Sequence, residues 1–418
     1  MSSGSPTAPP HGLRGSFLVA LGVFVGVVLM AGACRRGPRT PPTDFAELTP
    51  GVGYTNERVS REPWSIHIVR IDQGLPDLAI HSTHAQGGTP GLSSLSEQVR
   101  RSPAAFGTPV AAVNGDFYQR DREHAGDPRG LQIKEGELIS APNGGVAFWV
   151  DTGRQLHATN VNANFHVTWP DGTTNSFGLN QDRKANALVL YTPALGASTR
   201  TSGGREFILE PAGEAASRPL AINETLAARV LEVRDSGDSP IQTNRFVLSA
   251  GPALIKTLPH LSVGDSLQFT TATTPELRGA LTAIGGGPVL VRGGQVQRIQ
   301  PPSEKSYEFS SMMERHPRSA IGWDSRYFYL VTVDGRQEKL SVGMTLAELA
   351  QTFAQLGCTD AMNLDGGGSA TLWCDGKIRN NPCDGQERPI ANALVVTRKA
   401  GADSSARKED RQSGATTN

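Results

Sequence analysis

The sequence predicts a mostly β fold with a few helices. The 418 residues include 47 Gly and 28 Pro, while aromatic residues make up 6%, a composition typical of short strands joined by many turns. From Trp64 onward, segments such as 65–71 alternate apolar and polar residues, which is the pattern of half-buried strands. With 38% hydrophobic and 19% charged residues, the chain can bury a core, so a wholly disordered protein is excluded.

The first 34 residues have the pattern of an export signal. Arg14 precedes an apolar run at 17–30, and small residues then lead to Cys34. The run is shorter than the roughly 20 residues of a membrane-spanning helix. The pattern resembles a bacterial lipobox, in which Cys34 becomes a lipidated N-terminus; an uncleaved signal anchor is the alternative. Both predict a folded part outside the cytoplasm, in the cell envelope and tethered to the membrane through a linker at 35–60.

Residues 61–398 are expected to form a single domain. Strands are predicted at 65–71 and 110–114, with a short helix between them at 92–99. The section 155–275 alternates strands with turn signals and contains few motifs, so we interpret it as a possible β-rich insertion.

The clearest helix begins at Thr345. Thr345 and Glu348 form a capping box, and the apolar residues that follow share one face. Gly357 stands where a glycine commonly ends a helix. An apolar strand at 361–364 follows at once, so this strand–helix–strand unit places Asp365 at a strand end.

Three cysteines follow Cys34 in the sequence. Export permits disulfides, and Cys374 and Cys383 bracket a turn-rich loop, which favours a bridge between them. Cys358 is then left as a free thiol after the helix. Without a CxxC pair, these residues do not predict a zinc site. The polar residues 399–418 are expected to be a disordered tail.

The most distinctive segment is 363–369, Asn-Leu-Asp-Gly-Gly-Gly-Ser. Glycine loses the most conformational freedom on folding, so three in a row after a strand need a physical reason. One reason is the close approach of a ligand to bare backbone, whose N–H groups can hold an anion. The alternative is a tight turn between two strands.

Polar residues recur at the ends of apolar strands, and five such clusters flanked by glycine predict a site built on strand ends. The clusters are Asn114 with Asp116, His316 with Arg318, Asp334 with Arg336, Asn363 with Asp365, and Arg388 with Asn392. Asp116 and Asp365 are a natural acid–base or nucleophile pair for a glycosidic reaction. Arg318 and Arg388 can bind a phosphate through two N–H groups each, or form surface ion pairs. His316 is either a general acid or a structural histidine.

Several function classes are disfavoured. The formal net charge of +0 gives no basic excess for nucleic acid. No HExxH or paired histidine spacing indicates a catalytic zinc, and GxSxG, Walker and helix-opening GxGxxG motifs are missing from the sequence. No cofactor is indicated with certainty, and a divalent cation stays compatible with the sequence.

Six short motifs occur in order along the chain. They are NGDFY at 114–118, GGGP at 285–288, HPRSAIG at 316–322, VDGR at 333–336, NLDGGGS at 363–369 and RPIANA at 388–393. Together they resemble the phosphodiester glycosidase family, over about 110–396 and least over 155–275. The resemblance implies an α+β fold with mixed β-sheets. It also implies hydrolysis between a sugar anomeric carbon and a phosphodiester.

Site residues follow from the resemblance and from the chemistry of the strand-end residues. The expected catalytic residues are Asp365, Asp116, Asp334 and His316, and the expected substrate-binding residues are Asn114, Arg318, Asn363, Gly366, Gly367, Gly368, Ser369 and Arg388. The expected substrate is a glycan or sugar phosphate of the envelope or of extracellular polymers. A non-catalytic glycan-binding envelope lipoprotein and an ordinary glycosidase are the alternatives.

Overall fold

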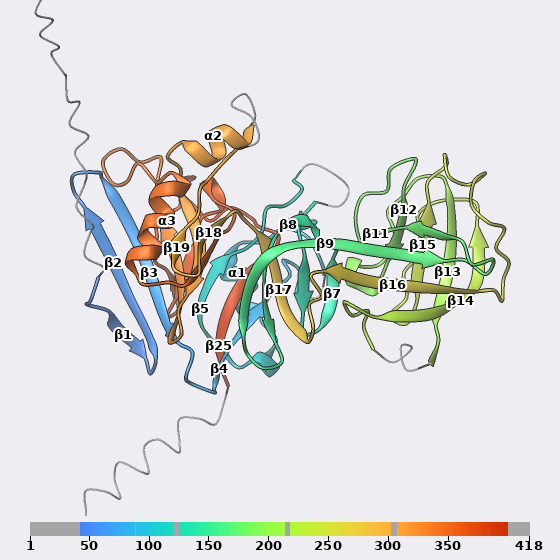
Figure 1. Cartoon of the computed structure of the whole chain (residues 1–418), viewed down its shortest axis with the longest axis horizontal. Helices are drawn as coiled ribbons and strands as arrows, with labels where there is room; N and C mark the ends of the chain where they lie inside the picture. The colour runs from blue at the N-terminus through green and yellow to red at the C-terminus, as the bar shows by residue number, and fades with distance from the viewer. Residues whose placement is uncertain (1–41, 88, 121–124, 214–217, 302–306, 400–418) are drawn as a thin grey trace, which may run out of the picture. The chain divides into compact units, whose positions relative to one another are not determined.

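The computed structural model describes residues 42–87, 89–120, 125–213, 218–301 and 307–399. Three β-sheets dominate these residues, and the α-helices are short (Figure 1). The helices are α1 Leu95–Arg100, α2 Tyr307–Met313 and α3 Leu346–Gln355, with 3₁₀ turns at Ala104–Phe106, Pro193–Leu195 and Gly367–Ser369. The expected mostly β fold with few helices is confirmed, and within the α+β class the protein lies at the sheet-dominated end. The implied mixed sheets are found only in part, because two of the three sheets are wholly antiparallel and the remaining one includes a parallel pair.

The first sheet has eight strands, each antiparallel to its neighbour. In spatial order they are β1 Ala46–Thr49, β2 Val52–Val59, β3 Trp64–Asp72, β21 Tyr327–Val333, β20 Arg318–Trp323, β22 Asp360–Asn363, β18 Val289–Arg292 and β19 Gln295–Val296. Elements from both ends of the chain therefore share this sheet.

The expectation that 35–60 is linker is wrong for its second half. Strand β2 pairs with β3 along its whole length, from Val52 opposite Ile71 to Val59 opposite Trp64. Most of its residues are only half-buried, so the sequence is too polar to stand out as a strand. The signal segment and lipidation expected at 1–34, and the tail at 400–418, lie outside the described residues. Within the described ranges, no helix is both long and apolar enough to cross a membrane.

The second sheet contains twelve strands and includes the section 155–275. Its main path is β11 Gly178–Leu179, β12 Leu188–Tyr191, β15 Phe246–Ala250, β13 Arg205–Pro211, β14 Thr225–Arg234, β16 Ser266–Thr274, β9 Leu156–Thr168, β8 Asn143–Asp151, β17 Ala280–Gly286, β6 Gln132–Lys134 and β7 Glu137–Ser140, while β10 Thr174–Ser176 pairs with β9. Figure 1 shows β9 as a long strand: its first half pairs with β8 and its second half with β16. One apolar cluster, including Trp169, Phe207 and Trp149, continues along this sheet.

The third sheet has five strands and delivers the NGDFY motif. Its order is β24 Lys377–Ile378, β23 Leu372–Cys374, β5 Thr108–Asn114, β25 Ala393–Arg398 and β4 Leu78–Ser82. Strand β5 is buried at its C-terminal end because it pairs with β23 on one side and β25 on the other.

Helix α3 confirms the expected capping box. The Thr345 side chain accepts from the Glu348 N–H at 3.1 Å, and the Glu348 carboxylate accepts from the Thr345 N–H at 2.9 Å. Phe353 is fully buried and packs against Gly322 of β20, where a Cβ would collide with its ring. This close packing aligns β20 and β22, whose ends carry the site.

Candidate active site

Asp365 lies where the ends of strands from all three sheets meet. Its N–H donates to the Gly115 carbonyl at 3.0 Å, just beyond the end of β5. On the other side, the Gly287 N–H donates to the Asn363 carbonyl at 2.7 Å, which joins the end of β17 to β22. Rigid strand ends therefore hold this carboxyl group, as the sequence predicted for it.

Asn114 holds the backbone on both sides of the glycine loop 366–368. Its amide N–H donates to the Asp365 carbonyl at 2.7 Å, and its amide oxygen accepts from the Thr371 N–H at 3.1 Å. The side chain is fully buried. The structure thus makes Asn114 a support for both ends of the loop, where the sequence suggested a substrate contact.

Asp116 lies in a narrow enclosure of bare backbone. Its carboxylate accepts from the Gly130 N–H at 2.7 Å, and its own N–H donates to the Asn392 side chain at 2.9 Å. A Cβ at Gly285 would collide with the carboxylate, and one at Gly130 would lie 3.0 Å from it. Asp116 is 4% exposed. Glycine at these positions lets a charged group be surrounded closely by main chain.

The pKa values of both carboxyl groups lie well above the ordinary value. Burial, and to a smaller extent the charge of Asp365, raise the pKa of Asp116 to about 7, whereas backbone N–H groups oppose the shift. Burial raises the pKa of Asp365 to about 6, against Ser369, the Gly366 N–H and nearby arginines. Two interacting carboxyl groups with raised pKa values can share a proton near neutral pH, which is a common acid–base arrangement.

Arginines surround the glycine loop. Arg388 donates to the Asp384 carboxylate at 3.0 and 2.7 Å, and a Cβ on Gly368 would collide with this pair. A Cβ on Gly366 would lie 2.7 Å from the Pro317 carbonyl, and Gly367 has a φ of +59°. The loop therefore needs glycine to pack against the protein itself, which corrects the expectation that the glycines leave space for ligand.

The positive charge near the carboxyl groups comes from Arg129 and Arg388. Arg388 lowers the pKa of Asp365, and Arg129 lowers the pKa of both Asp116 and Asp365. Arg129 is exposed, so its guanidinium can meet a ligand from solution. Sequence reasoning missed Arg129, because it lies in a polar loop without a motif.

Two buried polar atoms beside the loop have no hydrogen-bond partner within the described ranges. They are the Ser369 hydroxyl, by the distance and angle of its contacts, and the amide oxygen of Asn363, whose amide N–H donates to the Gly287 carbonyl at 3.0 Å. The Ser369 hydroxyl nevertheless lies near the Asp365 carboxyl group and the Tyr118 hydroxyl, since it lowers the pKa of both groups against the larger effect of burial. Buried polar atoms are rarely left unpaired, so the Asn363 amide oxygen marks a place for ligand or water.

Arg318 is bound to the protein. It is 4% exposed, and its guanidinium donates to the Met344 carbonyl at 2.7 Å and the Glu314 carbonyl at 2.8 Å. These contacts give Arg318 a structural role in this structure, and the expected phosphate contact stays a prediction. Nearby, the His316 Nε2 lies 3.2 Å from the Ser310 carbonyl, and burial with the charges of Arg318 and Arg336 lowers its pKa.

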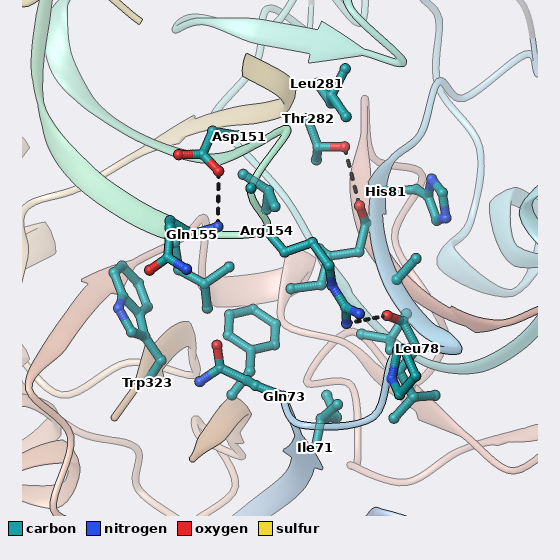
Figure 2. Close-up of a pocket in the computed structure, with 18 of the residues that line it drawn as sticks. Ile71, Gln73, Leu78, His81, Asp151, Arg154, Gln155, Leu281, Thr282 and Trp323 are labelled. Atoms are coloured by element: carbon teal, nitrogen blue, oxygen red, sulfur yellow. Dashed lines mark hydrogen bonds between the residues drawn. The ribbon is translucent and has the colours of Figure 1, made fainter. Parts of the chain in front are cut away.

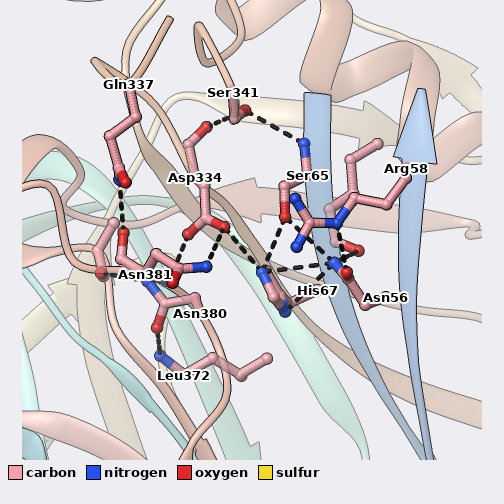
Figure 3. Close-up of polar contacts among 12 residues, drawn as sticks. Asn56, Arg58, Ser65, His67, Asp334, Gln337, Ser341, Leu372, Asn380 and Asn381 are labelled. Atoms are coloured by element: carbon pink, nitrogen blue, oxygen red, sulfur yellow. Dashed lines mark hydrogen bonds and ion pairs between the residues drawn. The ribbon is translucent and has the colours of Figure 1, made fainter. Parts of the chain in front are cut away.

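Asp334 belongs to a separate buried network (Figure 3). Its carboxylate accepts from the Asn381 N–H at 2.7 Å and side chain at 3.1 Å, and lies 2.9 Å from the His67 Nε2. Burial opposes ionisation, yet the hydrogen bonds from His67 and Asn381 hold the pKa of Asp334 below its ordinary value. Asp334 is 1% exposed and holds Asn381 in place, and its expected catalytic role stays a prediction.

The expected disulfide is not formed, because Cys374 and Cys383 are both free thiols. Cys374 is fully buried in the apolar core, where burial raises its pKa to about 11. Cys383 lies on the partly exposed loop, with its Sγ 3.5 Å from the Asp384 carboxylate. The spacing of the two cysteines in the sequence does not reveal that Cys374 belongs to the apolar core. Cys358 is free and buried, as expected.

The described residues contain no group of three or more His, Cys, Asp and Glu side chains that could hold a metal ion.

Residues 212–397 match the family model for phosphodiester glycosidase. The resemblance seen in the sequence motifs is thus confirmed for this part of the chain. The matched segment includes Asp365, the glycine loop and Arg388, whereas Asn114 and Asp116 precede it.

Two relatives of known sequence match parts of the chain, and one of them is named for this activity. The SPbeta prophage-derived uncharacterized protein YomE of Bacillus subtilis is 35% identical over 103 residues, which are 24% of this chain and 16% of that protein. Human N-acetylglucosamine-1-phosphodiester alpha-N-acetylglucosaminidase is 27% identical over 154 residues, or 37% of this chain and 29% of the enzyme. The chain therefore spans less than a third of the length of either relative.

A solved structure shares the fold. The crystal structure of a hypothetical protein from Synechocystis superposes with a TM-score of 0.66 at 22% identity, covering 84% of this chain and 63% of that one.

Proposed function

We propose that this protein hydrolyses the bond between a sugar anomeric carbon and the phosphate of a phosphodiester. The observation that carries the proposal is the pairing of Asp116 and Asp365, two buried carboxyl groups with raised pKa values, beside Arg129 and Arg388. The family match and the activity named for the human relative support the same reaction class.

Each group has a task in this reaction. Asp365, ionised above about pH 6, supplies negative charge at the anomeric carbon, as a nucleophile or as the base that activates water. Asp116 keeps its proton up to about pH 7 and donates it to the departing phosphate oxygen. Arg129 and Arg388 stabilise the phosphate charge. The anomeric C–O bond breaks, and the oxygen of water ends on the sugar.

We further propose that the substrate is a glycan or sugar phosphate of the cell envelope. Support comes from the signal-like segment and Cys34, which predict an exported lipoprotein held at the membrane. A diacylated cysteine gives stable anchoring, which a single acyl chain does not. Mass spectrometry of the purified N-terminus tests this: a lipidated Cys34 supports it, and an intact Met1 in the membrane fraction contradicts it.

Turnover separates the hydrolase from a binding protein that has kept the fold. Wild type and Asp365→Asn are incubated with nucleotide sugars and other sugar-1-phosphodiesters, and phosphorus NMR follows the release of a phosphate monoester. Release by wild type and at least about 100-fold slower release by the variant are expected, since a positioned acid or base contributes on this scale. Equal rates would place the reaction elsewhere, and no release from any substrate would favour the glycan-binding alternative.

A further inference from the structure

The guanidinium group of Arg336 lies against the glycine loop. A Cβ added at Gly367 would lie 3.3, 3.4 and 3.6 Å from the Nη2, Nη1 and Cζ atoms of Arg336. Arg336 stands just after β21 and has a φ of +57°, a left-handed conformation that is uncommon outside glycine. Such strain persists where the surrounding structure enforces it, often at functional sites. The roles assigned so far to the site do not include this arginine.

A neutral partner orients Arg336. Its Nη2 lies 3.4 Å from the Nδ1 of His316, and the Nε2 of the same ring lies 3.2 Å from the Ser310 carbonyl. When the Nε2–H donates to that carbonyl, Nδ1 is left to accept from Arg336. Burial and the charges of Arg318 and Arg336 lower the pKa of His316, which keeps the ring neutral near pH 7. His316 therefore orients the guanidinium without adding a negative charge.

The charge of Arg336 is not neutralised by an ion pair. Within the described ranges no carboxylate lies at ion-pair distance from it, and the residue is exposed. Against burial, Arg388 and Arg336 both lower the pKa of Asp384, yet only Arg388 binds this carboxylate, at 3.0 and 2.7 Å. An oriented guanidinium with no carboxylate partner is suited to bind an anion from solution through parallel N–H groups.

Two arginines lie against successive glycines of the loop. Arg336 lies against Gly367 and Arg388 against Gly368, and neighbouring Cα atoms are about 3.8 Å apart. The Gly368 N–H is buried and makes no hydrogen bond within the described part of the chain. Buried N–H groups are rarely unpaired, so this donor marks a place for an anionic oxygen or water.

Arg336 acts on other groups than the arginines beside the carboxyl pair. Against the larger effect of burial, Arg388 and Arg129 lower the pKa of Asp365, and Arg336 is not among these charges. Its charge instead reaches Asp384. A phosphate beside the carboxyl pair is therefore bound by Arg129 and Arg388, and an anion at Arg336 lies further from the anomeric carbon.

A cavity of about 890 Å³ elsewhere in the fold has the opposite charge balance (Figure 2). Carboxylates outnumber cations in its wall: Asp72, Glu135, Asp151 and Asp324 stand against Arg154, Lys399 and His81. Figure 2 shows Arg154 bound to the Leu78 carbonyl, at 2.7 Å. Arg154 is exposed and has a φ of +63°, so it matches Arg336 in residue type and backbone conformation, away from the glycine loop.

We propose that Arg336 and the Gly368 N–H bind a second phosphate group of the substrate, on the side of the reacting phosphate that faces away from the sugar. This inference rests on the proposed function. It narrows the substrate class to sugar 1-phosphates whose other ester half carries a further phosphate, as in a sugar linked through a diphosphate. His316 is a positioning residue for Arg336.

Calorimetry at fixed ionic strength tests this with inorganic pyrophosphate, which has two phosphate groups, and methyl phosphate, which has one. Wild type is expected to bind pyrophosphate at least about tenfold more tightly. Arg336→Gln should remove most of this preference, because it weakens pyrophosphate binding by about tenfold or more and methyl phosphate binding much less. Arg154→Gln is the matched control and should keep the wild-type preference.

Arg336→Gly is a second variant, because glycine adopts a φ of +57° without strain. Thermal melting of each variant shows whether a loss of binding is a loss of fold. The proposal is overturned if wild type does not prefer pyrophosphate, if both Arg336 variants keep the preference, or if Arg154→Gln loses it.

Turnover distinguishes this inference from the proposed hydrolysis. Arg336→Gln should raise the KM for a nucleoside diphosphate sugar at least about tenfold more than the KM for the methyl ester of the same sugar 1-phosphate. Equal changes in both KM values would contradict a second phosphate site. If wild type turns over neither compound, the proposed function fails, and the pyrophosphate titration still decides the role of Arg336.

Discussion

The folding stability of Asp116→Asn should depend less on pH than that of wild type. The same variant should lose activity. The native carboxyl group has a pKa of about 7, whereas the ordinary value is 3.8. The folded state therefore binds the proton more tightly than the unfolded state. The stabilisation from this proton is complete below the pKa of the carboxyl group in the unfolded chain, and it is lost as the pH rises through the folded pKa of about 7. Asn cannot ionise, so the variant lacks this dependence.

The size of the effect follows from the pKa difference. At pH 5 the unfolded carboxyl group has largely lost its proton, and the native group keeps it until about pH 7. Two pH units at about 1.4 kcal/mol each give roughly 3 kcal/mol. Wild type should lose this much stability between pH 5 and 8, whereas the variant should not. Asn retains an oxygen for the Gly130 N–H but adds a donor with no evident partner, a fixed cost of about 1–3 kcal/mol.

Urea unfolding at pH 5 and pH 8 measures this difference, because the fixed cost cancels between the two conditions. Asp44→Asn, at an exposed position, is the control and should follow wild type at both values. Turnover of Asp116→Asn should fall at least about 100-fold. If wild type and Asp116→Asn lose equal stability between the two pH values, the native carboxyl group does not hold its proton, and the reasoning fails.

Three further predictions concern the same end of the fold. The kcat/KM of wild type should follow a narrow bell against pH, rising near 6 as Asp365 ionises and falling near 7 as Asp116 loses its proton; a profile flat from pH 5 to 8 would contradict the assignment. Arg388→Lys should raise KM with little change in melting, whereas Arg318→Lys should lower the melting temperature, because Arg318 donates to two backbone carbonyls; the reverse pattern would exchange their roles. His67→Ala should destabilise the protein by about 1–3 kcal/mol or more in urea, since it removes a partner of a buried carboxylate, and an unchanged midpoint would show that this bond adds nothing.

The sequence predicted those helices and strands whose limits are set by residues close together in the chain. The capping box at Thr345 defines where α3 begins, and the apolar strand before Asp365 is β22. Strand β2 escaped notice because its outward residues are polar along most of its length. Strand β2 is recognised only by its hydrogen-bonded pairing with β3, and the sequence of β2 alone does not reveal that pairing.

Side-chain partners distant in sequence explain the rest of the discrepancies. Arg318 begins the apolar strand β20 and Asp334 follows the apolar strand β21, positions that a substrate-binding residue could also occupy. Their partners Met344 and Asn381 are 26 and 47 residues away, so only the folded chain shows that they are occupied. The association of Asp116 with Asp365 was predicted, yet the raised pKa values of both groups depend on burial that no motif records.

The hydrogen bond between the Asn114 amide and the Asp365 carbonyl joins residues 251 positions apart. Asn114 ends a strand of the five-stranded sheet, and Asp365 follows a strand of the eight-stranded one. The proposed acid–base pair, assembled across such a junction, exists only while both sheets are docked. Turnover should therefore report on the docking itself, and mild denaturant should abolish activity before either sheet loses its own strand pairing.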